Sequence, residues 1–190
     1  MKAAFALLPD RETFNAVSKL SWQMHRSYHT GLAVRRLPPH VSLKQPFAME
    51  DLEGLEEYMA FLAGSIAPFP ITLTQCQLWE TPDSGVLSRG VQENETLRAL
   101  HDRLNTELTE RFGERKADFD GPSYTFHMTI AAGGGSLETY REAFAECEAL
   151  SRTPTFVTRE LALFLYDNHD GKGEWEYLTY KILPLSGAEG

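Results

Sequence analysis

The sequence is poor in cysteine and has no long apolar run. Its two cysteines, Cys76 and Cys147, cannot build a disulfide framework for 190 residues, and each falls on the apolar side of its segment. Both are therefore expected to be buried, reduced thiols. The apolar run 3–8 is too short to span a membrane and is followed by charged residues without a cleavage-site pattern. We expect a cytoplasmic protein with no membrane partner.

Basic residues are also scarce. The chain has 18 Lys and Arg against 27 Asp and Glu, a net charge of −9. This balance argues against a general nucleic-acid coat protein, which needs a basic face. It still allows an enzyme that holds one phosphate in a small pocket. Hydrophobic residues at 42% and charged residues at 24% are typical of a globular chain. No linker or low-complexity segment interrupts it, so residues 1–190 are predicted to form a single domain, expected to be a monomer.

Hydrophobic periodicity predicts alternating strands and helices. Capping residues are expected at Asp10, Asn94 and Ser136, and helix ends at Gly64 and Gly113. Predicted strands cover residues 3–8, 40–47, 69–80, 86–91, 124–131, 156–166 and 174–183. Four helices are predicted from their apolar stripes: Phe14, Val17, Leu20 and Met24 in the first; Leu52, Leu55, Met59 and Leu62 in the second; Leu97, Leu100, Leu104, Leu108 and Phe112 in the third; and Leu137, Tyr140, Phe144 and Cys147 in the fourth.

Two of these strands carry the same four-residue pattern of histidine, apolar residue, hydroxyl and aliphatic residue. The first is His40-Val41-Ser42-Leu43 and the second is His127-Met128-Thr129-Ile130, 87 residues later. With six histidines, about one His-x-Ser/Thr match is expected by chance. A third match, His25-Arg26-Ser27, falls on a predicted helix, where residues two apart point in different directions. The pattern is therefore informative only because two copies lie on strands in two similar halves of the chain.

On a strand, residues two apart project from the same face. His40 and Ser42 should therefore point away from the core, and so should His127 and Thr129. If the two halves face each other, two imidazoles and two hydroxyls meet in one cleft. One imidazole can accept a proton while the other donates one near neutral pH. The hydroxyls can donate hydrogen bonds to phosphate oxygens. This constellation predicts phosphodiester chemistry without a metal or another cofactor.

On these residues the chain resembles the 2H phosphoesterase superfamily, which includes bacterial 2′-5′ RNA ligases and cyclic nucleotide phosphodiesterases. The resemblance covers nearly the whole chain, including Pro39 before the first motif, Gly90-Val91 in the hairpin, the helix from Leu97 to Leu108, and Phe126 before the second motif.

The resemblance implies an α+β, bilobal duplicated fold, with two mostly antiparallel sheets facing a central cleft, helices on the outside and a pseudo-two-fold axis. It also implies that 2′,3′-cyclic phosphate ends of RNA or nucleotides are opened to 2′-phosphates, and that some members join RNA ends by 2′-5′ bonds. In this analogy His40 and His127 share the acid and base roles, while Ser42 and Thr129 bind the phosphate. Many ligase-type members carry an arginine shortly after the second motif, where this chain has Ala131 and Ala132, which favours hydrolysis over ligation.

Three further residues are candidates for substrate binding. Lys44 shares the predicted face of His40 and could add positive charge, with a solvated lysine as the alternative. Phe47 and Tyr124 could stack a base, with a place in the core as the alternative. His25 and His29 have the spacing of a helical metal pair but lack a third ligand, so no metal site is predicted.

Two hypotheses from different classes remain. The first is a cyclic phosphodiesterase acting on RNA ends or small cyclic nucleotides. The second is a non-catalytic module that binds RNA or nucleotide phosphate ends. Two titratable side chains favour the enzyme, because a binding module does not need them. The pattern does not distinguish the base from the acid.

Overall fold

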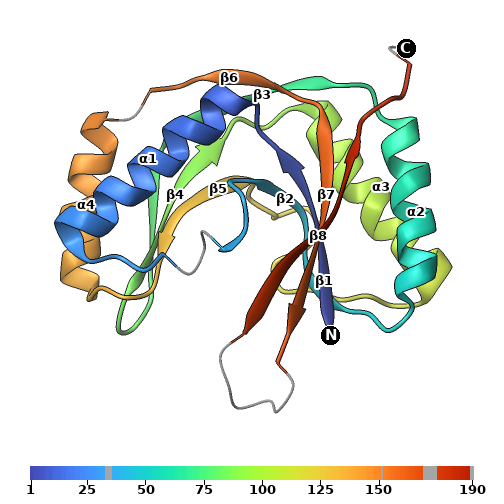
Figure 1. Cartoon of the computed structure of the whole chain (residues 1–190), viewed down its shortest axis with the longest axis horizontal. Helices are drawn as coiled ribbons and strands as arrows, with labels where there is room; N and C mark the ends of the chain where they lie inside the picture. The colour runs from blue at the N-terminus through green and yellow to red at the C-terminus, as the bar shows by residue number, and fades with distance from the viewer. Residues whose placement is uncertain (33–35, 151, 169–174, 189–190) are drawn as a thin grey trace.

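The computed structural model describes residues 1–32, 36–150, 152–168 and 175–188. Within these residues the chain forms four helices and eight strands (Figure 1). They follow the order β1 (Lys2–Leu8), α1 (Arg11–Tyr28), β2 (Val41–Ala48), α2 (Leu52–Ser65), β3 (Phe69–Glu80), β4 (Gly85–Val91), α3 (Glu95–Phe112), β5 (His127–Ala132), α4 (Leu137–Leu150), β6 (Thr155–Thr158), β7 (Glu160–Asp167) and β8 (Glu176–Pro184).

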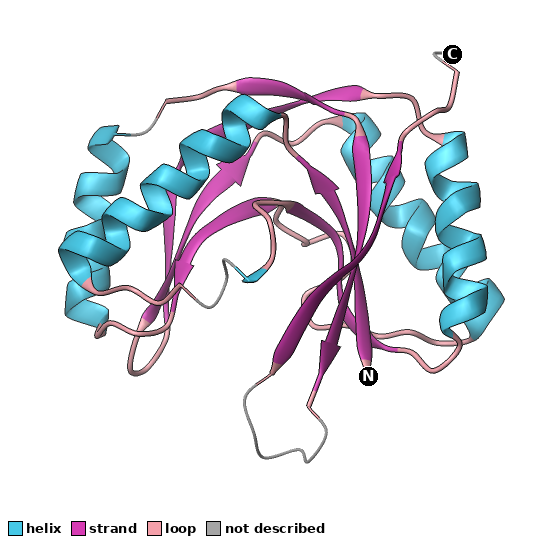
Figure 2. Ribbon diagram, in the orientation of Figure 1, coloured by secondary structure: helices cyan, strands magenta, loops and turns pink. Residues whose placement is uncertain are grey.

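The strands form two four-stranded sheets, one in the order β2-β1-β7-β8 and the other in the order β5-β4-β3-β6. Every pairing in the described part of the chain is antiparallel. The two sheets make an arch with the helices on its outer side (Figure 2). The expected α+β fold of two antiparallel sheets is therefore confirmed. The two motif strands, β2 and β5, are edge strands, one in each sheet.

Two of the helices, α1 and α3, pack on the sheet that does not contain the strand before them. Helix α1 follows β1 but packs on β5 and α4 of the other sheet. Helix α3 follows β4 but packs on β2, and α2 packs on β7 and β8. Figure 1 shows the result, with α1 and α4 on one side of the arch and α2 and α3 on the other. Each motif strand is thereby backed by a helix from the other half of the sequence.

Side-chain caps explain where the helices begin. The Asp10 carboxylate accepts a hydrogen bond from the Thr13 amide at 2.8 Å, and the Asn94 side chain accepts one from the Leu97 amide at 2.8 Å. Such caps satisfy amides that have no partner inside the helix. The predicted end of α2 at Gly64 was one residue early, because the helix continues to Ser65.

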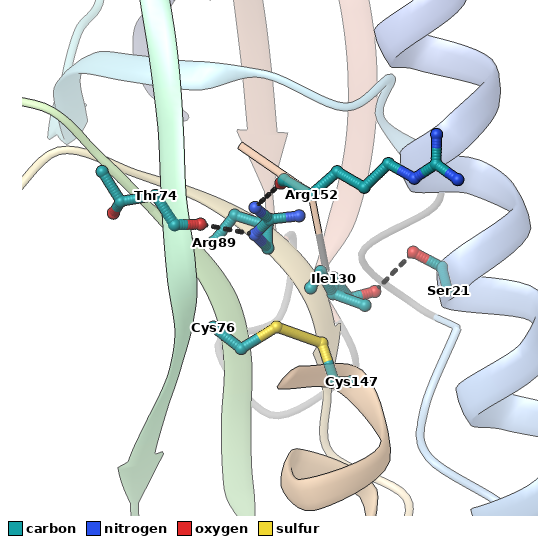
Figure 3. The surroundings of a disulfide bond; sticks show 7 residues. All are labelled: Ser21, Thr74, Cys76, Arg89, Ile130, Cys147 and Arg152. Atoms are coloured by element: carbon teal, nitrogen blue, oxygen red, sulfur yellow. Dashed lines mark hydrogen bonds between the residues drawn. A yellow bond between two sulfur atoms is a disulfide. The ribbon is translucent and has the colours of Figure 1, made fainter. Parts of the chain in front are cut away.

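The largest cluster of buried side chains takes members from both sheets, including Phe5 and Leu43 from one and Leu73 and Met128 from the other. Helix α1 contributes less to the core than its pattern predicts. Phe14 is 39% exposed, and the buried face of this helix consists of Thr13, Val17, Ser21 and Met24. The reason is a polar contact: the buried Ser21 hydroxyl donates to the Ile130 carbonyl at 2.7 Å (Figure 3), which turns this face of the helix toward β5.

Two predicted strands differ from the structure. The segment 124–131 becomes strand only at His127, so the motif histidine is the first residue of β5. The segment 156–166 is divided at Arg159 into β6, which pairs with β3, and β7, which pairs with β1. The chain passes from one sheet to the other at this residue. The burial pattern changes there, from alternating residues in β6 to a buried run in β7, but the pattern of a strand does not identify the strand with which it pairs.

The expectation of two reduced thiols was wrong. Cys76 on β3 and Cys147 on α4 form a disulfide (Figure 3), although they are 71 residues apart in sequence. The bond lies in a small apolar cluster between this helix and its sheet. The antiparallel ladder and the packing of α4 bring the two side chains together, which spacing along the chain could not indicate. The expectation of a reducing compartment rested on these thiols and loses that support.

Candidate active site

The two motif histidines have the same local setting. Each stands where a loop enters its strand, and each ring is held by the carbonyl oxygen two residues earlier. The Nδ1 atom of His40 donates to the Pro38 carbonyl at 2.8 Å, and that of His127 donates to the Thr125 carbonyl at 2.9 Å. Because a carbonyl only accepts, Nδ1 carries the proton in the neutral ring. The lone pair of each neutral ring is therefore on Nε2, the atom able to exchange a proton with a substrate.

The strand alternation predicted from the sequence is confirmed in both motifs. The apolar partners Val41, Leu43, Met128 and Ile130 are fully buried. His40, Ser42, His127 and Thr129 are all half-buried. The hydroxyl of each motif therefore lies on the same side of its strand as the histidine.

The two motif strands also lie close together. Strands β2 and β5 belong to different sheets, yet they have Cα atoms within 8 Å of each other at the middle of the arch (Figure 1). Tyr124, just before β5, links them: its hydroxyl donates to the Ser42 carbonyl at 3.2 Å and accepts from Gln45 Nε2 at 2.9 Å. The first motif is thereby connected to the segment that leads into the second.

An aromatic ring packs against each histidine. Phe164 of β7 meets the His40 ring at a centroid distance of 4.7 Å, and Trp79 of β3 meets the His127 ring at 4.3 Å, both edge to face. Burial lowers the pKa of His127, and the hydrogen bond to the Thr125 carbonyl opposes that effect. Burial disfavours the charged imidazolium, so His127 is held in the neutral form more strongly than an exposed histidine. A neutral ring at pH 7 can accept a proton.

Lys44 does not lie with the histidines. Its side chain is almost fully buried, and its ammonium donates to Asn105 Oδ1 at 2.6 Å and forms an ion pair with Asp120. The cause is a β-bulge. Successive residues of β1 pair with Lys44 and then with Ser42, so Leu43 is an extra residue on β2. The bulge turns Lys44 to the helix side of the sheet, and the prediction that it shares the face of His40 was wrong.

A third histidine, which sequence reasoning did not single out, supports the first motif from behind. His101 on α3 is fully buried, its Nδ1 donates to the Leu43 carbonyl at 2.7 Å, and its Nε2 accepts from the Gly121 amide at 3.3 Å. This ring therefore spans the bulge in β2 and the loop before β5. Its place within the leucine stripe of a predicted helix was the only signal in the sequence that it is buried.

Neither aromatic residue proposed to stack a base is open to solvent. Phe47 is fully buried beside Phe5, and Tyr124 is 3% exposed with its ring stacked on His101 at 4.7 Å. Both belong to the main core, which was the alternative considered for each. The structure instead places Trp79 beside His127, and nothing in the strand pattern of residues 69–80 distinguishes this tryptophan from a core aromatic.

The described residues contain no group of three or more His, Cys, Asp and Glu side chains that could hold a metal ion. His29 is not part of α1 but its C-cap, with a left-handed φ of 54°, so the spacing expected for a metal pair is lost. His25 instead uses its Nδ1 to contact the Thr30 carbonyl at 2.7 Å.

No helix in the described ranges is long and apolar enough to cross a membrane.

Comparison with known proteins agrees with this geometry. The sequence matches the model of the 2′-5′ RNA ligase superfamily over residues 9–170. It is 25% identical over 185 residues to a Staphylococcus aureus (strain JH1) protein named "Putative phosphoesterase", covering 96% of this chain and 99% of that protein.

Two solved structures have a similar fold. TT0787 of Thermus thermophilus has a TM-score of 0.64 at 18% identity, with complete coverage of both chains. Escherichia coli LigT complexed with NADP+ has a TM-score of 0.57 at 17% identity, with 97% of each chain covered. The paired histidine strands, the two antiparallel sheets and the sequence match lead to one conclusion: this chain belongs to the 2′-5′ RNA ligase superfamily, the 2H phosphoesterases.

Proposed function

We propose that this protein is a phosphodiesterase that opens 2′,3′-cyclic phosphates to 2′-phosphates, with His40 and His127 exchanging the protons. The observation that carries the proposal is the matched setting of these histidines. Each Nδ1 is engaged by the carbonyl of the residue two positions earlier, so in both neutral rings the lone pair is on Nε2. Family membership supports phosphodiester chemistry in general.

The reaction needs one base and one acid. One neutral imidazole takes a proton from water as the water oxygen forms a bond to phosphorus. The bond between phosphorus and the 3′-oxygen breaks, and the other histidine, as imidazolium, gives its proton to that oxygen. Ser42 and Thr129 donate hydrogen bonds to the non-bridging oxygens, where negative charge must be stabilised. The lowered pKa of His127 favours its neutral form, which suits the role of base.

The substrates we propose are small cyclic nucleotides or RNA ends. A net charge of −9 opposes binding along a long RNA backbone and favours a short ligand. LigT has been crystallised with NADP+, with 3′-AMP and with phosphate, so a protein of similar fold accommodates nucleotides. Ligation of RNA ends is less well supported, because Ala131 and Ala132 follow the second motif, and Ala131 is fully buried.

The test is turnover of a 2′,3′-cyclic nucleotide in the presence of EDTA, with the position of the product phosphate determined by ³¹P NMR. Replacing His40 or His127 by Ala should lower kcat by about 100- to 10,000-fold, as expected for loss of a proton-transfer group. His25→Ala is the matched control, since it removes the histidine of the third His-x-Ser match, and it should leave kcat unchanged.

Full turnover by either motif variant would refute the acid–base assignment. Tight binding of the cyclic nucleotide without any product, unaffected by both substitutions, would favour the binding-module hypothesis instead. A product with its phosphate at the 3′ position would still be consistent with two-histidine catalysis, but it would mean that the bond between phosphorus and the 2′-oxygen breaks instead.

A further inference from the structure

The rings that pack on the two motif histidines differ in one respect. Phe164, against His40, is fully buried, whereas Trp79, against His127, is 36% exposed. Otherwise the two contacts are alike, both edge to face at centroid distances of 4.7 and 4.3 Å. Part of Trp79 is therefore open to solvent next to a proposed catalytic residue, whereas Phe164 is enclosed by protein.

The strand register places Trp79 on the same face of its sheet as the second motif. Its neighbour Leu78 packs toward the small apolar cluster under α4, so Trp79, one residue later, points to the opposite face. Gln77 lies on that face too, and it pairs with Ser88, which in turn pairs with Thr129. A polar row thus runs across the sheet from the motif hydroxyl toward the strand of Trp79.

This face also carries two buried polar atoms. The Oε1 atom of Gln77 and the Oγ atom of Ser88 are buried, and neither has a hydrogen-bond partner among the described residues. Buried polar groups are normally paired, and leaving one unpaired is unfavourable. Both oxygens are covered by protein atoms, so they make the sheet face next to Thr129 polar and do not themselves provide contacts for a ligand.

We propose that Trp79 is the residue on which the nucleobase of the substrate stacks. The inference rests on the proposed function. In a 2′,3′-cyclic nucleotide the base and the phosphate are attached to the same ribose, so a phosphate held by His127 and Thr129 brings the base close to the neighbouring side chains of that face. Trp79 is the exposed aromatic residue in contact with His127. Stacking on an aromatic side chain tolerates any base, because each base has a π-face.

The experiment measures binding, so that its result does not depend on turnover. Dissociation constants for a nucleoside 2′-monophosphate and for ribose 2-phosphate, which has no base, are determined by titration calorimetry. The wild type should prefer the nucleotide. Trp79→Leu should weaken nucleotide binding by about 5- to 150-fold, the range for loss of one base stack, and the preference for the nucleotide should disappear. Trp79→Phe should retain most of the preference for the nucleotide.

Phe61→Leu is the matched control. Phe61 is also an exposed aromatic residue, at 50%, but it lies on α2, which packs on β7 and β8 and not on a motif strand, so its loss should change neither affinity. An equal loss for both ligands in Trp79→Leu would overturn the inference, because it would mean that the indole only supports His127. A wild type without preference for the nucleotide would overturn it as well.

The two proposals fail differently. If the wild type binds the nucleotide in a Trp79-dependent way but does not turn over a cyclic phosphate, the stacking role stands and the proposed activity is refuted. If turnover occurs and depends on both motif histidines while Trp79→Leu keeps its preference for the nucleotide, the activity stands and the stacking role is refuted.

Discussion

The disulfide between Cys76 and Cys147 should account for a large share of the stability of this fold. Its two ends are 71 residues apart, and the bond joins β3 to α4. In the chain-entropy description, closing a loop of this length lowers the entropy of the unfolded chain by about 15 cal/mol/K, or about 4 kcal/mol at 25 °C. Both side chains are buried, so their thiols should stay packed after reduction. The loss on reduction should then arise mainly from the unfolded state.

Urea unfolding with and without a reductant measures this contribution. A domain of this size has a slope of about 2 kcal/mol/M in urea, so reduction should lower the midpoint by about 2 M. The matched control is the double variant Cys76→Ser, Cys147→Ser, whose midpoint should not respond to reductant. Mass spectrometry of the unfolded, alkylated wild type should show no free thiol. Two alkylated cysteines, or equal midpoints in the two conditions for a chain shown to be oxidised, would refute the reasoning.

Two further predictions concern residues near the motifs. Asp120→Ala should lower the free energy of unfolding by about 3 to 5 kcal/mol, because it leaves the buried Lys44 ammonium without its ion-pair partner. Urea unfolding measures this change. A variant that is fully stable but binds phosphate poorly would show instead that Lys44 acts in the cleft. The pKa of His127 is lowered, so the unfolded chain takes up this proton first as the pH falls. The contribution of the neutral His127 to the free energy of unfolding is therefore fully present above about pH 6.5. It is lost as the pH falls toward the folded-state pKa, because the unfolded chain then binds the proton more readily. An NMR titration of its ring proton should have a midpoint below about 6.5, and a midpoint above that value would contradict the burial of the ring.

The part of the site that could be predicted depends on local periodicity. On a strand the direction of a side chain is set by its position relative to its neighbours, so His40 and Ser42, or His127 and Thr129, must share a face wherever their strand is placed. The caps at Asp10 and Asn94 are equally local, since each side chain reaches an amide three residues ahead. These features were therefore correct before any tertiary contact was known.

The features that sequence reasoning missed all depend on contacts between distant segments. Lys44 lies four positions from His40 within the predicted strand, yet the bulge formed against β1 turns it toward Asp120. Arg159 separates two strands only because their partners belong to different sheets. Cys76 meets Cys147 across a helix–sheet interface, and Trp79 meets His127 across the sheet.

The sequence alone thus determined the matched motifs, their orientation on strands and the pattern of elements around them. The tertiary structure decided what stands behind and beside the motifs: the buried His101, the ion pair of Lys44 and the exposed ring of Trp79. The physical reason is that strand direction follows from the two-residue repeat of the backbone, whereas register, bulges and the packing of helices on sheets arise only when segments far apart in sequence pair.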